Sequence, residues 1–587
     1  MFGKKRIPYG ERVGVLVGRG NEPNTLRAAV AFSESEKAPI LGEFLVVEES
    51  ELRKRRLLCR VDDITYGDFH TTQDERERTL VEKYIRDISG HERPFSEEEK
   101  SMLFFQHYTL RVLGEFRVDE DTNEERIATD YRYLPELTAI LRYPRQEELK
   151  TLTAAGLPHL REEDETNAHL PAVGHLSFGE SEVQDVLVRF DVSRFAAKRT
   201  AIFARTGYGK SNLAKFVVAL AGITAPDSGM LIMDLEGEYA FTTSKEDGSK
   251  VYGLADIPHL QPRLTVFTNR KVHSSGVQVY GLMNFKTMSP YYLRRLIPAS
   301  PEGDERATIQ DFAAILEAVK EEWNQLLSIV ETSPEEWQER EKQIEKIVDK
   351  AAEKGAVTKT QRNLLARTIR HLLPLHNPKG TNVFEEIQRS LKNRRIVILD
   401  LSLFPLQFAN QIAAVALERI FAYNQYHITT QSTIPVIAVF EEAQNVLNKK
   451  AVESGDSIFV RWAKEGRKYN LGLIYITQQP GAIAEEIVSQ TDNFFVMHLL
   501  SKGDVDALVR ANRHYGGVIA HFLMTETVVG NAYIYSAPYQ PFVFPAHIWE
   551  FKPEVFTELF GNPPTDSGDY RQQPKQPTLF NETRNTQ

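Results

Sequence analysis

The sequence predicts an α/β protein in which a small β-rich domain precedes a larger domain built on a parallel sheet. Three observations support this prediction. From about residue 8 to 60, short β-rich runs alternate with turns, as in small barrels and sandwiches. From about residue 186, apolar strands alternate with helical segments, which is typical of a parallel sheet. Near residue 204, a strand runs through a glycine-containing loop into a helix. At 587 residues, the chain has room for two to four domains.

The composition, 42% hydrophobic and 26% charged residues, is ordinary for globular proteins. The net charge of -10 argues against a surface that is basic throughout, but it leaves room for Lys and Arg gathered in a channel. The single cysteine, Cys59, excludes an intrachain disulfide and a Cys-based zinc site. No apolar run follows the basic residues 1–6, and none approaches the ~20 residues that span a bilayer. We therefore expect a soluble, cytoplasmic protein without membrane contact.

The β-rich domain is assigned to residues 1–185. Strands are expected at residues 12–18, 28–32, 42–47, 57–61 and 111–116, where apolar and β-branched residues gather between turn signals. Strands of this length and spacing predict a small barrel or sandwich.

The loop after residues 201–203 has the chemistry of a phosphate-binding loop. Gly207 and Gly209 allow backbone N–H groups to turn inward at a helix N-terminus, where the helix dipole favours anions. Lys210 would reach the β and γ phosphates, and the Ser211 hydroxyl would bind Mg²⁺. Ala204 stands where this pattern has its first glycine, and it adds only a methyl group. The expected nucleotide-binding residues here are Thr206, Gly207, Tyr208, Gly209, Lys210, Ser211 and Asn212.

Four later apolar strands, at residues 230–234, 396–400, 436–440 and 471–477, end in polar residues that should gather at the carboxyl edge of one sheet. Only the third is followed by two adjacent carboxylates. We therefore assign Glu441 to the Mg²⁺ shell and Glu442 to activation of the attacking water. Asp400 has no second acid beside it. Asp234 begins a turn whose Gly237 and Glu238 suggest a role other than water activation. We group Asp234 with the nucleotide-binding residues.

Two further residues are candidates for catalysis. Arg467 follows a helix and could stabilise charge at the γ-phosphate, although a charge pair with Lys468 at the helix C-terminus is the alternative. Gln478 ends the fourth strand and could report the nucleotide state, or it could make structural hydrogen bonds only.

The core domain is assigned to residues 186–561, with a helical insertion at about 286–390. The charged helices of the insertion are interpreted as a subdomain with solvated faces, the alternative being a coiled-coil partner site. Residues 562–587 have the composition of a disordered tail. Within it, residues 576–580, from Gln576 to Phe580, resemble peptides that dock on the bacterial sliding clamp, but such short matches also arise in ordinary polar tails.

The order and spacing of these motifs resemble those of the HerA branch of the HerA/FtsK ATPases. The resemblance is carried by residues 206–212, 234–239, 396–401, 441–444, 465–468 and 478–480, and by the β-rich start of the chain. It implies a RecA-like core that forms a hexameric ring around double-stranded DNA and moves along it on ATP and Mg²⁺. It also implies a partner: a nuclease in DNA end resection, or a nuclease or Sir2-type NAD-consuming effector in bacterial anti-phage systems.

By position, the resemblance gives Lys210 and Ser211 phosphate and Mg²⁺ binding, Glu442 catalysis, and Arg467 a place near the γ-phosphate, including that of a neighbouring subunit. A second family arginine matches Lys198 or Arg199 loosely. Ala204, Glu441 and Gln444 depart from the family pattern and put the hydrolysis rate in question. Two alternatives remain open: a nucleotide-regulated scaffold that assembles and activates an effector with little translocation, and an ATPase that pumps other polymers.

Overall fold

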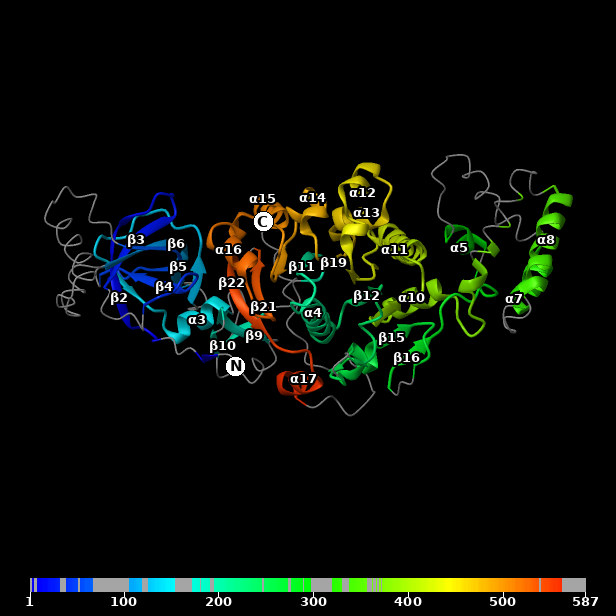
Figure 1. Cartoon of the computed structure of the whole chain (residues 1–587), viewed down its shortest axis with the longest axis horizontal. Coiled ribbons are helices and arrows are strands. Elements are labelled where there is room, and N and C mark those ends of the chain that lie inside the picture. The colour runs from blue at the N-terminus through cyan, green and yellow to red at the C-terminus, as the bar shows by residue number, and fades with distance from the viewer. Residues whose placement is uncertain are drawn as a thin grey trace, which may run out of the picture.

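The computed structural model describes residues 3–4, 8–31, 38–50, 53–66, 105–118, 125–153, 172–179, 181–190, 195–244, 248–272, 276–288, 290–296, 319–329, 337–355, 362, 366, 369–370, 372–537 and 540–561. The molecule is elongated. A β-barrel lies at one end, the large sheet with its helices lies in the middle, and α7 and α8 lie at the other end (Figure 1).

Six antiparallel strands close into the predicted N-terminal barrel. Their order is β3-β2-β8-β4-β5-β6, and pairing of β3 with β6 closes the ring. The strands are β2 (Arg12–Arg19), β3 (Thr25–Ala31), β4 (Phe44–Glu48), β5 (Arg56–Tyr66), β6 (Phe105–Val118) and β8 (Ile140–Arg142), with β7 (Glu125–Ala128) added beside β6. Alternate apolar residues such as Leu16, Leu45, Leu57 and Leu110 fill the interior. The barrel reading of the first strands is confirmed.

The predicted domain boundary at 185/186 is wrong, because it falls inside a strand of the other sheet. β9 (Ala172–Phe178) and β10 (Ser181–Arg189) pair with each other, and β9 pairs with β22 (Gln540–Ile548) of the large sheet. Their alternating sequence resembles that of the barrel strands, and only long-range pairing distinguishes them. The barrel ends before residue 172.

The large sheet has thirteen strands in the order β1-β10-β9-β22-β21-β20-β11-β19-β18-β12-β17-β15-β16. The strands from β20 to β16 are parallel to their neighbours. Their bounds are β11 (Arg199–Phe203), β12 (Gly229–Asp234), β15 (Leu264–Phe267), β16 (Gln278–Tyr280), β17 (Ile396–Asp400), β18 (Val436–Phe440), β19 (Leu471–Thr477) and β20 (Asn493–Val496). Beyond β20, β21 (Asn531–Ser536) pairs antiparallel, and the short β1 (Gly3–Lys4) ends this side of the sheet in a parallel pair with β10.

Helices cover both faces of this sheet, so its central strands are buried throughout. In β11, Ile202 packs in the cluster with α4 (Lys210–Thr224), whereas Ala201 and Phe203 point to the opposite face. That second face packs against α10 (Val383–Lys392), α11 (Leu406–His427) and α13 (Ile458–Glu465). The result is the three-layer α/β architecture that the sequence predicts.

The remaining helices lie around this core. They are α3 (Gln146–Thr153), α5 (Pro290–Arg295), α7 (Lys320–Ile329), α8 (Trp337–Glu353), α12 (Lys449–Ser454), α14 (Glu485–Val488), α15 (Lys502–Ala511), α16 (Val518–Thr525) and α17 (Pro553–Phe560). Single 3-10 turns occupy 254–256, 261–263, 373–375, 443–445, 466–469, 480–482 and 513–515, and β13 (Thr243–Ser244) pairs with β14 (Lys250–Val251).

The segment between β12 and β17 has two features that the sequence did not predict. It supplies two further sheet strands, β15 and β16, before any of the expected helices. It also ends in α10, which packs on β12 and β17 and so belongs to the core. α7 and α8 pack against each other, and several of their Glu and Lys side chains are exposed. The described part of the chain has no helix long and apolar enough to cross a bilayer.

Candidate nucleotide-binding site

The predicted phosphate loop lies at the carboxyl edge of the sheet, between β11 and α4. Gly207 and Gly209 both take left-handed backbone conformations, with φ of 88° and 100°, and Gly209 is the N-cap of α4. An added Cβ at Gly209 would meet Met497 and Gly530, so the loop is packed closely against the turn before β21. The positive φ of Gly209 is therefore the reason that this position favours glycine.

Lys210 and Glu442 form an ion pair across this edge. The Lys210 Nζ lies 2.7 Å from Glu442 Oε1, and the lysine is buried. β18 places Glu442 because it runs parallel to β19, which pairs in turn with β11. The lysine and the catalytic acid expected from the sequence thus meet, although they are far apart in the chain.

Glu442 accepts hydrogen bonds at both carboxylate oxygens. Gln478 Nε2 donates to Oε1 at 3.4 Å, and Gln444 Nε2 donates to Oε2 at 2.6 Å. Burial alone would raise the pKa of Glu442, but the hydrogen bonds from Lys210 and Gln444 outweigh it and hold the pKa below its usual range. Gln478 also accepts a hydrogen bond from the Thr206 hydroxyl. Thr206, Lys210, Glu442 and Gln478 therefore form one network.

Glu441 is buried beside this network and is held differently. Its Oε2 is buried and has no hydrogen-bond partner among the described residues. Burial, together with the negative charges of Asp234 and Glu236, raises the pKa of Glu441 well above its usual range. A cation bound at this point would stabilise the ionised Glu441 carboxylate and so lower its pKa.

Asp234 organises the turn that follows β12. Its carboxylate accepts hydrogen bonds from the backbone N–H groups of Gly237 (2.6 Å), Glu238 (3.1 Å) and Tyr239 (3.0 Å). Burial raises the pKa of Asp234 to about 6, against the lowering effect of these bonds. The turn so formed brings Glu236 and Glu238 into electrostatic range of Glu441.

Asp400, at the end of β17, stabilises the same turn by holding Arg270, which contacts Gly237. It accepts hydrogen bonds from Thr268 Oγ1 and Arg270 Nε, both at 2.7 Å, while Arg270 Nη2 donates to the Gly237 carbonyl at 2.6 Å. These bonds outweigh burial and keep the pKa of Asp400 below its usual range. Asp400, which has no second acid beside it, thus supports the site through Arg270.

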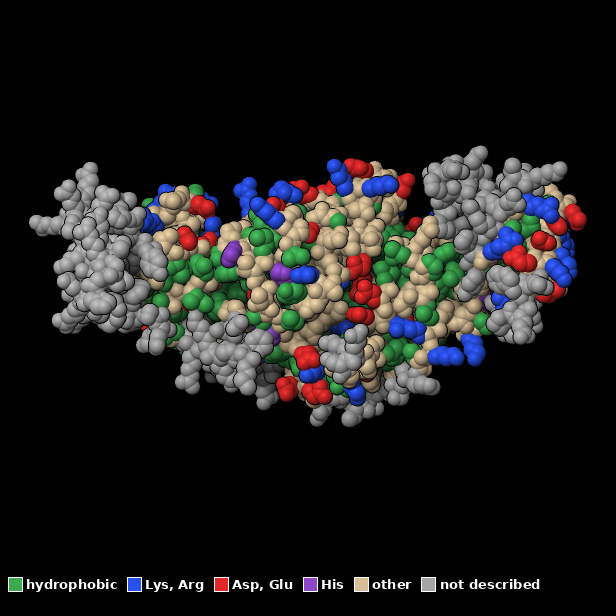
Figure 2. Space-filling view, viewed as in Figure 1, with side chains coloured by type: hydrophobic (Ala, Val, Ile, Leu, Met, Phe, Trp, Pro, Cys, Tyr) green, Lys and Arg blue, Asp and Glu red, His purple; other side chains and the backbone are tan. Residues whose placement is uncertain are grey.

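The residues present fit a Mg²⁺ ion held jointly with nucleotide phosphates. The partnerless Glu441 oxygen lies among acidic side chains, and Ser211 stands in the first turn of α4. Within the described ranges, no group of three or more His, Cys, Asp or Glu side chains could hold a metal ion alone. Figure 2 shows acidic side chains gathered near the middle of the viewed face. This chemistry suits an ion that takes few protein ligands and several phosphate or water oxygens.

Two of the expected nucleotide-binding side chains make contacts within the fold. Asn212 Nδ2 donates to the Trp549 carbonyl at 2.8 Å, and Asn212 Oδ1 accepts from the Phe551 N–H at 2.6 Å. The Tyr208 ring lies over His498, with ring centroids 4.3 Å apart. These contacts join the loop and α4 to later parts of the chain, and the loop glycines and Lys210 carry the phosphate-binding character.

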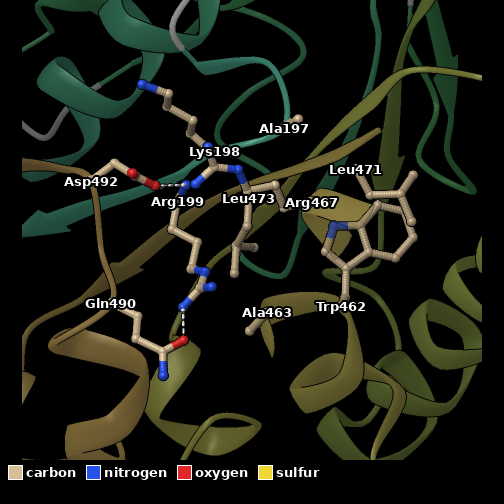
Figure 3. Close-up of a pocket in the computed structure, with 10 residues that line it drawn as sticks. All are labelled: Ala197, Lys198, Arg199, Trp462, Ala463, Arg467, Leu471, Leu473, Gln490 and Asp492. Atoms are coloured by element: carbon tan, nitrogen blue, oxygen red, sulfur yellow. Dashed lines mark hydrogen bonds between the residues drawn. The ribbon is translucent and has the colours of Figure 1, made fainter. Parts of the chain in front are cut away.

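Arg467 lies away from this network. It is exposed in the 3-10 turn just before β19, in a pocket with Lys198, Arg199 and Asp492 (Figure 3). Because β11 and β19 are parallel, this turn is at the amino edge of the sheet, and the phosphate loop is at the carboxyl edge. The five residues of β11 alone separate the two edges by about 13 Å, at ~3.3 Å per residue. Arg467 and the phosphate loop of the same chain therefore do not meet.

The pocket around Arg467 is basic. Arg199 donates to Gln490 Oε1 at 2.8 Å, and the Arg199 backbone N–H donates to Asp492 Oδ2 at 3.1 Å. Burial lowers the pKa of Arg199, and the positive charge of Arg467 acts in the same direction, whereas Asp492 opposes it. Two guanidinium groups held near each other favour an incoming anion.

Sequence reasoning missed three residues of the site. Gln444 was noted only as a departure from a family pattern, although it hydrogen-bonds to Glu442. Thr477 and Arg270 were not singled out. Gln444 and Thr477 stand beside predicted site residues in the sequence, but Arg270 follows β15, a strand that the sequence did not reveal.

The fold and the site together define a P-loop ATPase: a parallel sheet with helices on both faces, a glycine loop with its lysine, and a glutamate at a neighbouring strand end. Residues 172–420 match the family model described as "Helicase HerA, central domain". This part of the chain is therefore similar to the central domain of HerA helicases. Glu441, Glu442, Arg467 and Gln478 lie beyond the matched residues.

Relatives are distant but consistent with this assignment. The chain is 22% identical over 358 residues to a probable helicase of Methanocaldococcus jannaschii, in a match that covers 60% of this chain and 62% of that protein. It is also 22% identical over 456 residues to the DNA double-strand break repair helicase HerA of Sulfurisphaera tokodaii, covering 74% and 82%. The first match thus spans less than two thirds of that helicase.

Two solved structures resemble parts of the chain. The bacterial conjugative coupling protein TrwB has a TM-score of 0.39 and 12% identity, over 72% of this chain and 95% of that one. VirB4 of Thermoanaerobacter pseudethanolicus has a TM-score of 0.36 and 16% identity, over 66% and 97%.

Proposed function

We propose that this protein hydrolyses ATP with Mg²⁺ and works as a ring-shaped DNA translocase or helicase of the HerA type, together with a nuclease or another effector enzyme. The observation that carries the proposal is the Lys210–Glu442 pair at the carboxyl edge of the sheet. It joins a phosphate-binding lysine to a carboxylate in position to activate water. The names of the relatives, both helicases, support DNA as the substrate.

In this mechanism, Lys210 exchanges one anion for another. When nucleotide enters the loop, Lys210 turns from Glu442 to the β and γ phosphates, and Glu442 Oε1 becomes available to accept a proton from the attacking water. Gln478 contacts both Glu442 and Thr206, so it is placed to register this exchange. Ser211 and Glu441 are the residues that would hold Mg²⁺, which would neutralise phosphate charge when bound.

Arg467 supports a ring in which each nucleotide site is shared. It lies at the opposite sheet edge from its own phosphate loop, so a head-to-tail neighbour is needed to bring the two together. In such a ring, Arg467 of one subunit stabilises charge at the γ-phosphate of the next, and Lys198 and Arg199 line the same face. We propose that the ring is a hexamer and that it is located in the cytoplasm.

A second function is a nucleotide-regulated scaffold that assembles and activates an effector, a nuclease or a Sir2-type NADase in anti-phage defence. The observation that favours it is Glu441, a long acidic side chain in a setting that raises its pKa. Such a residue suits slow hydrolysis, in which bound nucleotide would stabilise the assembly for longer. The clamp-binding peptide predicted at 576–580 lies outside the described residues and stays a prediction.

The two functions are separated by the rate of ATP hydrolysis with and without linear duplex DNA, at low and moderate salt. A translocase is stimulated by DNA, and the stimulation weakens as salt rises because phosphate contacts release counterions. An unstimulated rate, combined with stable co-purification of the neighbouring operon product, would refute the translocase in favour of the scaffold. A native mass measurement of the complex gives the number of subunits and tests the hexamer.

A further inference from the structure

The side chain of Gln444 lies between Glu442 and the end of β19. Its Nε2 donates to Glu442 Oε2 at 2.6 Å, and its Oε1 accepts from the Thr477 hydroxyl, also at 2.6 Å. Thr477 Oγ1 in turn accepts from the Gln479 backbone N–H at 3.0 Å. A continuous relay of hydrogen bonds therefore runs from the backbone after β19 to one oxygen of the catalytic carboxylate.

The chemistry of the partners fixes the orientation of the Gln444 amide. The Thr477 hydroxyl accepts from the Gln479 N–H and can still either donate to or accept from the Gln444 amide. The ionised Glu442 carboxylate can only accept, so a flipped amide would place Gln444 Oε1 against it, and two acceptors would face each other. The Glu442 end of the amide therefore sets the orientation, with the donor toward Glu442 and Oε1 toward the Thr477 hydroxyl.

The relay holds Glu442 Oε2, the carboxylate oxygen to which Lys210 and Gln478 do not donate. Lys210 and Gln478 both donate to Oε1, and Lys210 must leave for the phosphates when nucleotide binds. Gln444 donates to Oε2, and its support comes from Thr477, which is fully buried. Among these three donors, Gln444 is the one whose support lies outside the phosphate loop.

Glu442 has a strained backbone. Its φ of 44° and ψ of 46° place a residue with a side chain in the left-handed region. This conformation directs the carboxylate toward Lys210, and a side chain with one tether lost would have other rotamers open to it.

We propose that Gln444 and Thr477 are positioning residues, which hold the Glu442 carboxylate in line for the attacking water after Lys210 has moved to the phosphates. This inference rests on the proposed function, in which Glu442 activates water. The Gln444 amide does not itself touch the reacting atoms. It acts through Glu442, and Thr477 acts through Gln444.

The test compares Thr477→Val, Thr477→Ser and Gln444→Leu in the full chain. Valine keeps the volume of threonine and removes the hydroxyl, whereas serine keeps the hydroxyl. We expect Thr477→Val and Gln444→Leu to lower kcat for ATP by on the order of 10- to 100-fold, the cost of a small misplacement of a reacting group. Thr477→Ser should retain most of the native kcat, and affinity for a fluorescent ATP analogue should change by less than about threefold in all three.

Two further comparisons separate positioning from general damage. The double variant Gln444→Leu/Thr477→Val should be no slower than Gln444→Leu alone, since both break one relay. Asn445→Leu, at the exposed neighbouring position, and Thr200→Val, a buried threonine at the other edge of the sheet, serve as matched controls and should keep the native kcat.

The outcomes distinguish the relay from the function on which it rests. Native turnover in Thr477→Val or Gln444→Leu overturns the relay and leaves Glu442 as the catalytic base. A Thr477→Ser variant as slow as Thr477→Val also overturns it, because packing and not the hydroxyl would then be responsible. If the native chain binds nucleotide but shows no Mg²⁺-dependent turnover in any condition, the proposed function fails and the relay fails with it.

Discussion

Arg467 gives the sharpest test of the shared nucleotide site. Arg467→Ala removes an exposed side chain, so the free energy of unfolding should change by less than about 0.5 kcal/mol. Its effect on hydrolysis should be large, because an arginine that stabilises the γ-phosphate in trans contributes about 10³-fold or more to kcat. That factor corresponds to at least ~4 kcal/mol of transition-state stabilisation, at ~1.4 kcal/mol per tenfold. A small effect on stability and a large one on rate identify a residue whose partner is another subunit's nucleotide.

The assay mixes two inactive variants. Lys210→Ala chains lack the phosphate-binding lysine but present Arg467, and Arg467→Ala chains have the reverse defect. Random mixing at equal amounts places the complementary pair at about one interface in four, so we expect about a quarter of the native ATP turnover to return. Arg389→Ala, an exposed arginine on α10, is the control and should keep the native rate. If the mixtures stay inactive although a native mass measurement shows rings that contain both variants, the action of Arg467 in trans is refuted.

Two further predictions concern the turn behind the acidic side chains. Gly237→Ala should lower the free energy of unfolding, measured by chemical denaturation, by more than Gly248→Ala does. Both glycines have positive φ, so an alanine at either position costs about 1–2 kcal/mol of backbone strain. Only at Gly237 would the new Cβ also overlap the Arg270 guanidinium. Equal losses of stability in the two variants would contradict the close contact between Gly237 and the Arg270 guanidinium. Asp234 has a pKa of about 6 in the fold against an ordinary 3.8, so its contribution to stability is full below pH 3.8 and is lost as pH rises through 6. The stability difference between the native chain and Asp234→Asn should therefore change across that range, and a difference that is constant with pH would refute the assignment.

The sequence predicted the features of this molecule that depend on local pattern. The glycine loop, the acid-ended strands and the first barrel strands each have a signature within a short stretch, and the parallel order then brings Lys210, Glu442 and Gln478 to one edge. Glu442 could be chosen over Asp400 because two adjacent acids are visible in the sequence.

What could not be predicted depends on long-range pairing. β15 and β16 are short, and only the pairing of β15 with β17 and of β16 with β15 makes them sheet strands. The same holds for β9, which pairs with β22, and for β10, which pairs with β9, and these pairings move the domain boundary. Arg270 and Gln444 acquire their roles from partners that the sequence does not place beside them in space, and the wide separation of Arg467 from Lys210 follows from the direction of β11 and β19.

The central claim is that Glu442 activates water at the site where Lys210 binds phosphate. Its most direct test is steady-state ATP turnover with Mg²⁺ by the native chain and by Glu442→Gln, beside the affinity of each for a fluorescent ATP analogue. Glu442→Gln should lose about 10²- to 10⁴-fold in kcat, the contribution of a positioned general base, and should bind nucleotide at least as tightly as the native chain. Unchanged turnover in Glu442→Gln would contradict it.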